Sequence, residues 1–167
     1  MSEAKLEVRA ASEPLMVGKR GLVMGVANDR SLAWGIARSA AEHGAELAFT
    51  YQGEALAKRV GPLAESIGSN VLLPCDVNDD AALDAVFADI RDRWGGLDFV
   101  VHAIAYSDKE ELKGRYIDTS QENFRRTMDV SCYSFTESYK CGSTRALWYR
   151  KGDYLGGGGH FGKPSSV

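Results

Sequence analysis

The residues best suited to chemistry lie in a glycine-containing turn near the amino terminus. A short apolar run (22–24) ends at Gly25, a polar turn follows, and Ser31 opens a helix-like pattern that contains Gly35. Glycine lets the chain turn sharply and lets a ligand approach the backbone, while Gly35 would let the helix lie close to the strand. The first amides of a helix have no partner within it, so this turn can hold a phosphate. The spacing is not G-x-G-x-x-G, so the turn alone is equally well an ordinary strand-to-helix connection.

Four other candidate residues follow three further expected strands. The carboxylate of Asp76 can accept a hydrogen bond from an adenine amine, while the Val77 amide meets a ring nitrogen. Gln52 stands where many NAD sites have an acidic residue for the ribose, and no Arg or Lys stands beside it, which favours NADH over NADPH. Singly, Asp76 reads as a helix cap, Gln52 as surface and Ile104 as core. Together, at successive strand ends, they predict a dinucleotide site.

Alternating strands and helices would position these residues. The strands are expected at 22–24, 46–51, 71–75 and 97–102. The helices are expected at 31–43, at 54–67 with an interruption near Gly61-Pro62, at 78–94, and from a capping box at 119–122. This pattern predicts an α/β fold with a doubly wound, Rossmann-type parallel sheet, of which only the first four strands are recognisable, in the order 3-2-1-4. Ligands of such sheets bind at the carboxyl ends of the strands, where the candidate residues lie.

Composition and charge exclude several classes of function. A net charge of −3 argues against nucleic acid or an anionic membrane as the main partner. Residues 1–17 read as a flexible arm without the apolar segment of a signal peptide, and no 18-residue apolar run predicts a membrane span. The three cysteines form no C-x-x-C motif, so we expect no metal site, no disulfide framework and a cytoplasmic location.

Residues 18–135 resemble the enoyl-[acyl-carrier-protein] reductase branch of the short-chain dehydrogenase/reductase superfamily. The similar motifs are the G-x5-S-x3-G turn at 25–35 and the segments 48–52, 75–77, 102–104 and 129–135. The long turn, and Asp129 where other short-chain reductases usually have Asn, are typical of this branch. The resemblance implies NAD contacts at Gly25, Ser31, Leu32, Gln52, Asp76, Val77 and Ile104, and a position near the substrate for Ser107.

The resemblance also implies an activity and an assembly. The family uses NADH to reduce a trans-2-enoyl thioester on acyl carrier protein in fatty-acid synthesis, and it forms homotetramers. Its catalytic tyrosine precedes a lysine by seven residues, beyond a fifth strand that is not recognisable here. Tyr133 and Lys140 have this spacing, but Tyr133 belongs to the preceding structural helix, so no catalytic residue is recognised. His102 reads as a strand-end residue.

Two alternatives remain open. Beside an active enoyl reductase, the chain can be a catalytically inactive fragment that binds NAD or oligomerises, or another short-chain reductase that acts on a ketone. The long glycine turn and Asp129 speak against the ketone reductase.

The chain changes character after residue 137. Residues 1–137 carry a net charge of −7, whereas residues 138–167 carry +4 and include the glycine run 156–159. We therefore expect three segments: the arm 1–17, a partial dinucleotide-binding domain 18–137, and an irregular, aberrant tail 138–167. A frameshift in the coding DNA would explain the tail. If no other reading frame encodes a family-like continuation after this point, the frameshift explanation is excluded. Ending the sheet after four strands would leave the 97–102 strand as an unpaired edge.

Overall fold

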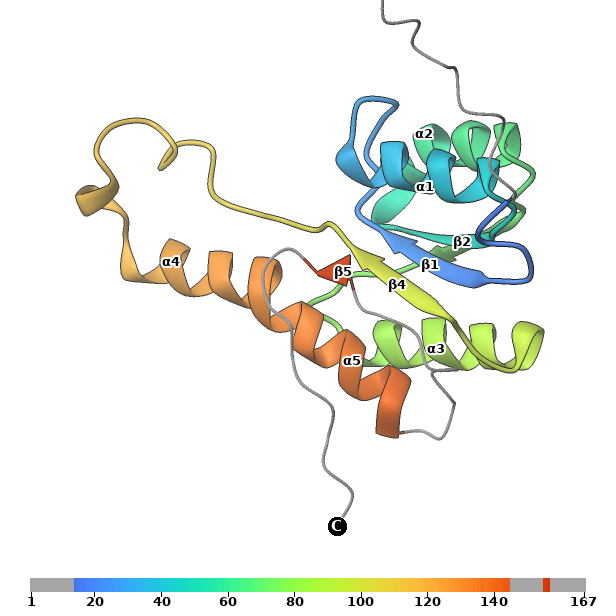
Figure 1. Cartoon of the computed structure of the whole chain (residues 1–167). Helices are drawn as coiled ribbons and strands as arrows, with labels where there is room; N and C mark the ends of the chain where they lie inside the picture. The colour runs from blue at the N-terminus through green and yellow to red at the C-terminus, as the bar shows by residue number, and fades with distance from the viewer. Residues whose placement is uncertain (1–13, 145–154, 157–167) are drawn as a thin grey trace, which may run out of the picture.

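The computed structural model describes residues 14–144 and 155–156 (Figure 1). Residues 1–13, most of the expected arm, and residues 145–154 and 157–167 of the expected tail lie outside the described part. Residues 15–18 form a turn, and the Met16 amide donates to the His43 carbonyl at 2.9 Å. The end of the arm is therefore bound to the domain.

A parallel sheet forms the centre of the domain. Its strands are β1 (Arg20–Met24), β2 (Glu46–Tyr51), β3 (Val71–Pro74), β4 (Phe99–His102) and β5 (Leu155–Gly156), in the order β3-β2-β1-β4-β5. The expected order 3-2-1-4 is confirmed. The short strand β5 was not expected, and it pairs Leu155 with Val101 and Gly156 with His102 on the edge predicted to be free. Two residues paired through the main chain leave no side-chain periodicity in the sequence, which explains why the strand was missed.

Helices cover both faces of the sheet (Figure 1). The helices α1 (Leu32–Glu42) and α2 (Gly53–Ser66) pack on one face, and α3 (Asp80–Trp94) packs on the other. Successive residues of β1 alternate between the two cores: Leu22 and Met24 pack with α3, whereas Val23 packs with α1 and α2. This double burial explains why the strands read as continuous apolar runs.

The helix α2 continues through Pro62, so the interruption expected at Gly61-Pro62 is wrong. Pro62 lies on the exposed side, where water can bond the carbonyl that its missing N–H leaves unpaired. Val60 and Ala64, on either side of the proline, are fully buried and hold both parts of the helix against the sheet.

A long helical segment follows the loop after β4. The helix α4 (Gln121–Met128), a π-helical stretch (Asp129–Tyr133) and α5 (Ser134–Thr144) run end to end. The expected cap at Thr119 is replaced by Ser120, whose hydroxyl accepts from the Asn123 amide at 3.1 Å. Glu111, rather than Glu122, completes this cap by accepting from the Ser120 amide at 2.8 Å.

Residues 138–144 are helical, although the sequence predicted an irregular tail from residue 138. Ser138 is 1% exposed, and its hydroxyl donates to the Ser134 carbonyl at 2.8 Å. The buried side of this helix thus carries a small polar residue whose hydroxyl bonds its own backbone, and it lacks the aliphatic residues that usually mark a buried face in the sequence.

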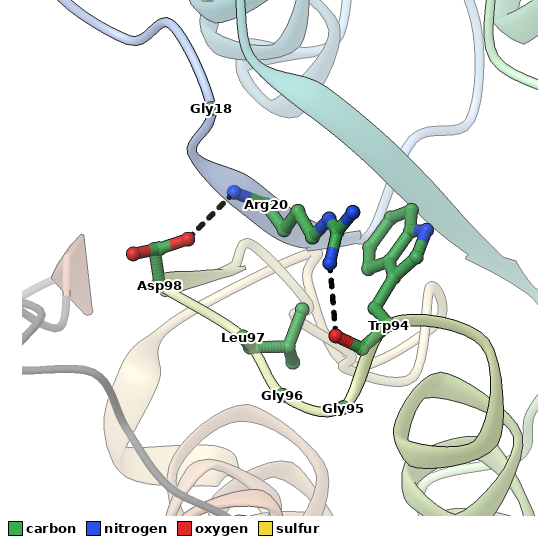
Figure 2. Close-up of a pocket in the computed structure, with 7 residues that line it drawn as sticks. All are labelled: Gly18, Arg20, Trp94, Gly95, Gly96, Leu97 and Asp98. Atoms are coloured by element: carbon green, nitrogen blue, oxygen red, sulfur yellow. Dashed lines mark hydrogen bonds between the residues drawn. The ribbon is translucent and has the colours of Figure 1, made fainter.

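A cavity of about 650 Å³ lies at the amino ends of β1 and β4, opposite the predicted site (Figure 2). The Arg20 guanidinium donates to the Trp94 carbonyl at 2.9 Å and lies 5.9 Å from the centre of the indole ring. The buried Asp98 accepts from the Arg20 amide at 2.9 Å and from Lys19 Nζ at 3.2 Å. Because these polar groups bond one another, we interpret the region as a structural junction between β1, β4 and the end of α3.

Candidate functional site

A second cavity, of about 320 Å³, lies at the carboxyl ends of β1 to β4. Five predicted residues line it: Gly25, Gln52, Asp76, Val77 and Ile104. They come from four separate strand ends, which a parallel sheet brings to one edge. The volume is near the lower limit for small-molecule sites.

Gly25 permits the close approach of two strands beside this cavity. Its φ is +99°, and a Cβ atom built on it would lie 2.2 Å from the Ala103 carbonyl oxygen. The Ala103 amide in turn donates to the Met24 carbonyl at 3.0 Å. Only glycine combines this backbone conformation with this contact.

Asp76 joins the ends of β2 and β3. Its Oδ2 accepts from Gln52 Nε2 at 2.8 Å, and its Oδ1 accepts from the Asn78 amide at 2.9 Å. The Asn78 amide is the main cause that lowers the pKa of the Asp76 carboxyl below its usual range, and Gln52 adds to it. The helix cap of α3 is Asp79, whose carboxylate accepts from the Ala81 amide. Asp76 is therefore an ionised acceptor at neutral pH rather than a helix cap.

Ser31 and Leu32 do not line the cavity. The Ser31 hydroxyl accepts from the Ala27 and Asn28 amides at 3.1 and 3.0 Å, so it organises the turn. The Leu32 side chain is 84% exposed. Within the described residues, however, no hydrogen bond occupies the amides of Leu32 and Ala33, which begin α1. These two amides, rather than the serine hydroxyl, remain available to a ligand.

The expected role of Gly35 is wrong. Gly35 lies on the exposed side of α1, and a Cβ atom there would meet no atom within 4 Å. Ala33 and Ala37 are the small buried residues that bring the helix close to the sheet.

Ser107 lies beside α4, outside the lining of the cavity. Its hydroxyl oxygen is 3.2 Å from Asn123 Nδ2 and 3.4 Å from Thr127 Oγ1. The buried Asn123 also accepts from the Asp108 amide at 3.0 Å, which fixes the loop after β4 on the helix. The position of Ser107 is therefore set by α4.

Arg126 was missed from the sequence. Its guanidinium lies 4.5 Å from the centre of the Tyr106 ring, and both residues line the cavity. Val130, one helical turn after Arg126, also lines it. This i, i+4 spacing is the signal that could have placed one face of the helix at the site.

His102 is the last residue of β4 and lies against the long helical segment that contains Ser134. It is 8% exposed, its Nε2 lies 2.8 Å from Ser134 Oγ, and that hydroxyl donates to the Val130 carbonyl at 2.7 Å. Ser134 Oγ therefore accepts from the His102 Nε2–H, because the Ser134 proton is already donated to Val130. Burial lowers the pKa of His102 below its ordinary value.

Acidification below the ordinary histidine pKa of about 6.5 is expected to destabilise the fold, since the unfolded chain takes up a proton that buried His102 resists. The contribution is complete above that pKa and decreases as the pH falls toward the lower folded pKa, with a slope of at most about 1.4 kcal/mol per pH unit. Urea unfolding at pH 7.5 and 5.5 measures it. The variant His102→Gln should lose this slope, and an unchanged slope would assign the effect elsewhere.

Tyr133 and Lys140 touch, but they lie off the cavity. Lys140 Nζ is 3.1 Å from the Tyr133 hydroxyl and 2.6 Å from Glu137 Oε1, and Tyr133 is 51% exposed. The Lys140 ammonium lowers the pKa of the Glu137 carboxyl. Neither Tyr133 nor Lys140 is among the residues that line the cavity.

The described part of the chain holds no group of three or more His, Cys, Asp or Glu side chains placed to bind a metal ion. None of its helices combines the length and the apolarity needed to cross a membrane.

The strand order is that of a doubly wound α/β fold, and the cavity lies at the carboxyl ends of the strands, where ligands of such folds bind. The chain belongs to the family described as enoyl-(acyl carrier protein) reductase, whose model matches residues 25–153. The match extends beyond residue 135, where the sequence predicted the family likeness to end.

Named relatives agree with this membership. The chain is 67% identical over 126 residues to an enoyl-[acyl-carrier-protein] reductase [NADH] of Rhizobium meliloti, a match that covers 75% of this chain and 47% of the relative. It is 54% identical to the FabI protein of Candidatus Liberibacter asiaticus, with a TM-score of 0.75 over 77% of this chain and 50% of that structure. It is 55% identical to the reductase of Anaplasma phagocytophilum in complex with NAD, with a TM-score of 0.74 over 76% of this chain and 48% of that structure. The chain thus spans about half the length of these relatives.

Proposed function

We propose that this chain binds NADH in the cavity at the carboxyl ends of β1 to β4, as part of an NADH-dependent enoyl-[acyl-carrier-protein] reductase. The observation that carries the proposal is the convergence of Gly25, Gln52, Asp76, Val77 and Ile104 from four strand ends on one cavity. Family membership supports the same cofactor, because the Rhizobium relative is named as an NADH enzyme.

The groups at the site fit a dinucleotide. The ionised Asp76 accepts hydrogen bonds, as an adenine amine requires, and the Val77 amide lies next to it in the chain. The free amides of Leu32 and Ala33, which begin α1 outside the lining of the cavity, suit a pyrophosphate. Gln52, bonded to Asp76 through its Nε2, keeps its carbonyl oxygen for a ribose hydroxyl. Bound NADH would supply the hydride, while these residues would hold and orient it.

We base the proposed substrate and assembly on the same family membership. We assign as substrate a trans-2-enoyl thioester on acyl carrier protein, with Ser107 near it, and a cytoplasmic location. A homotetramer agrees with the exposure of apolar side chains on α4 and the preceding loop: Ile117 is 80% exposed, Phe124 48% and Met128 43%. Such a surface is typical of an interface between subunits. We keep the boundary between an arm, 1–17, and the domain as a proposal, whereas the boundary expected at residue 137 falls inside the helix α5 (Ser134–Thr144).

A second candidate is NADH binding without reduction. It is favoured by the position of Tyr133 and Lys140, which touch each other off the cavity. Tyr133→Phe should leave both NADH binding and any NADH oxidation unchanged.

Parallel measurements of NADH binding and of crotonyl-thioester turnover by the 167-residue chain distinguish the candidates. Binding with turnover supports the reductase, and binding alone supports the inactive fragment. A chain that binds no NADH would overturn both.

Asp76→Ala is expected to weaken NADH binding about tenfold, because it removes an ionised acceptor of hydrogen bonds. The matched control is Asp79→Ala, which removes the adjacent helix-capping carboxylate instead.

A further inference from the structure

Arg126 and Tyr106 form one stacked pair on the wall of the cavity. The guanidinium carbon lies 4.5 Å from the centre of the tyrosine ring, within the range of a cation–π contact. No salt bridge engages Arg126 within the part of the chain that the structure describes, although its charge helps to lower the pKa of the Asp76 carboxyl. Arg126 is therefore held by an aromatic face rather than by a carboxylate.

The π-helical segment fixes the backbone of Tyr106, the aromatic member of this stacked pair. The Tyr106 amide donates to Ser131 Oγ at 3.0 Å, and the oxygen of the same hydroxyl lies 3.3 Å from the Tyr106 carbonyl. Arg126 and Ser131 belong to one continuous helical segment, so this segment carries the arginine and also fixes the backbone of the tyrosine on which it stacks. A guanidinium whose position is set in this way loses little conformational freedom when a ligand binds.

Charge and shape decide what this arginine can contact. Arginine is planar and stacks on aromatic rings with either face. Tyr106 covers one face of Arg126, and the cavity lies beside the pair. Asp76 and Val77, which offer an edge of polar groups to a base, line the same cavity. An aromatic base bonded along its edge by these two residues can be covered on its face by Arg126.

We infer that Arg126 is a nucleobase-stacking residue, which binds the face of the adenine ring of the cofactor while Asp76 and Val77 bind its edge. This inference rests on the proposed NADH site. It assigns Arg126 to the base rather than to the pyrophosphate or to a 2′-phosphate. It also gives the Arg126–Tyr106 pair a function in ligand binding beyond local stability.

Two ligands and two variants test the assignment in the full chain. Adenosine carries the base without phosphate, whereas ADP-ribose carries both. Arg126→Lys keeps the charge but loses the plane, and Arg125→Lys makes the same change at the exposed neighbouring arginine, which does not line the cavity. Calorimetry gives the affinities, and thermal unfolding verifies that each variant is folded.

We expect Arg126→Lys to weaken adenosine and ADP-ribose by the same factor, about tenfold, and Arg125→Lys to weaken neither. A loss confined to ADP-ribose and reduced by salt would show a phosphate contact and overturn the assignment. Unchanged affinity for both ligands, or equal losses in the two variants, would also overturn it. A wild-type chain that binds neither ligand would overturn the NADH site itself, so the two failures are distinguishable.

Discussion

Replacing Gly25 with alanine is expected to destabilise the fold by about 3 kcal/mol or more. The added Cβ atom would lie 2.2 Å from the Ala103 carbonyl oxygen, and the backbone φ of +99° is unfavourable for any side chain. Neither the carbonyl nor the strand end can move freely, because the Ala103 amide bonds the Met24 carbonyl at 3.0 Å. Urea unfolding followed by far-ultraviolet circular dichroism measures the change.

Gly35 provides the matched control. It lies in the exposed part of the helix α1, and an added Cβ atom meets open space. Gly35→Ala should therefore stabilise the fold by about 0.5 to 1 kcal/mol, through the higher helix propensity of alanine. Equal destabilisation by the two substitutions would contradict the proposed role of Gly25.

Replacing Asp98 with alanine is expected to cost about 2 to 3 kcal/mol of stability. Asp98 is 6% exposed, and its carboxylate accepts from the Arg20 amide at 2.9 Å (Figure 2). It also accepts from Lys19 Nζ at 3.2 Å. Its removal leaves the partly buried Arg20 amide, at the start of β1, without a partner. Chemical denaturation of the wild type and the variant gives the difference.

Asp92→Ala is the control for this substitution. Asp92 pairs with Arg91 on an exposed surface, where its side chain is 77% accessible. An exposed ion pair contributes about 0.5 kcal/mol or less, so the control should have nearly wild-type stability. A similar loss in both variants would show that the junction around Asp98 does not hold the sheet together.

The sheet was predictable from sequence because parallel strands buried on both faces leave continuous apolar runs. The run 97–102 is an example, and the strand order that such runs predicted is the order observed. The edge of the sheet at which Gln52, Asp76 and Ile104 meet was predictable for the same reason. A residue directly after a parallel strand has its place set by topology rather than by side-chain detail.

Other features depend on contacts that a linear pattern does not contain. The role of the Ser31 hydroxyl depends on which amides the turn directs toward it, and the continuation of α2 through Pro62 depends on which side of the helix faces water. Arg126 reaches the site from a helix remote in sequence. Its position depends on Tyr106, which Ser131 holds through the backbone. Periodicity alone does not encode such long-range pairs.

Hydrogen exchange of the full chain with and without NADH tests the central claim most directly. We predict that NADH slows exchange at 25–27, 50–52, 76–78 and 103–106, which line the cavity at the carboxyl ends of the strands. Segment 95–98, which lines the cavity at the opposite ends of the strands, should exchange at an unchanged rate. Protection confined to 95–98, or no protection in any of these segments at saturating NADH, would contradict the account.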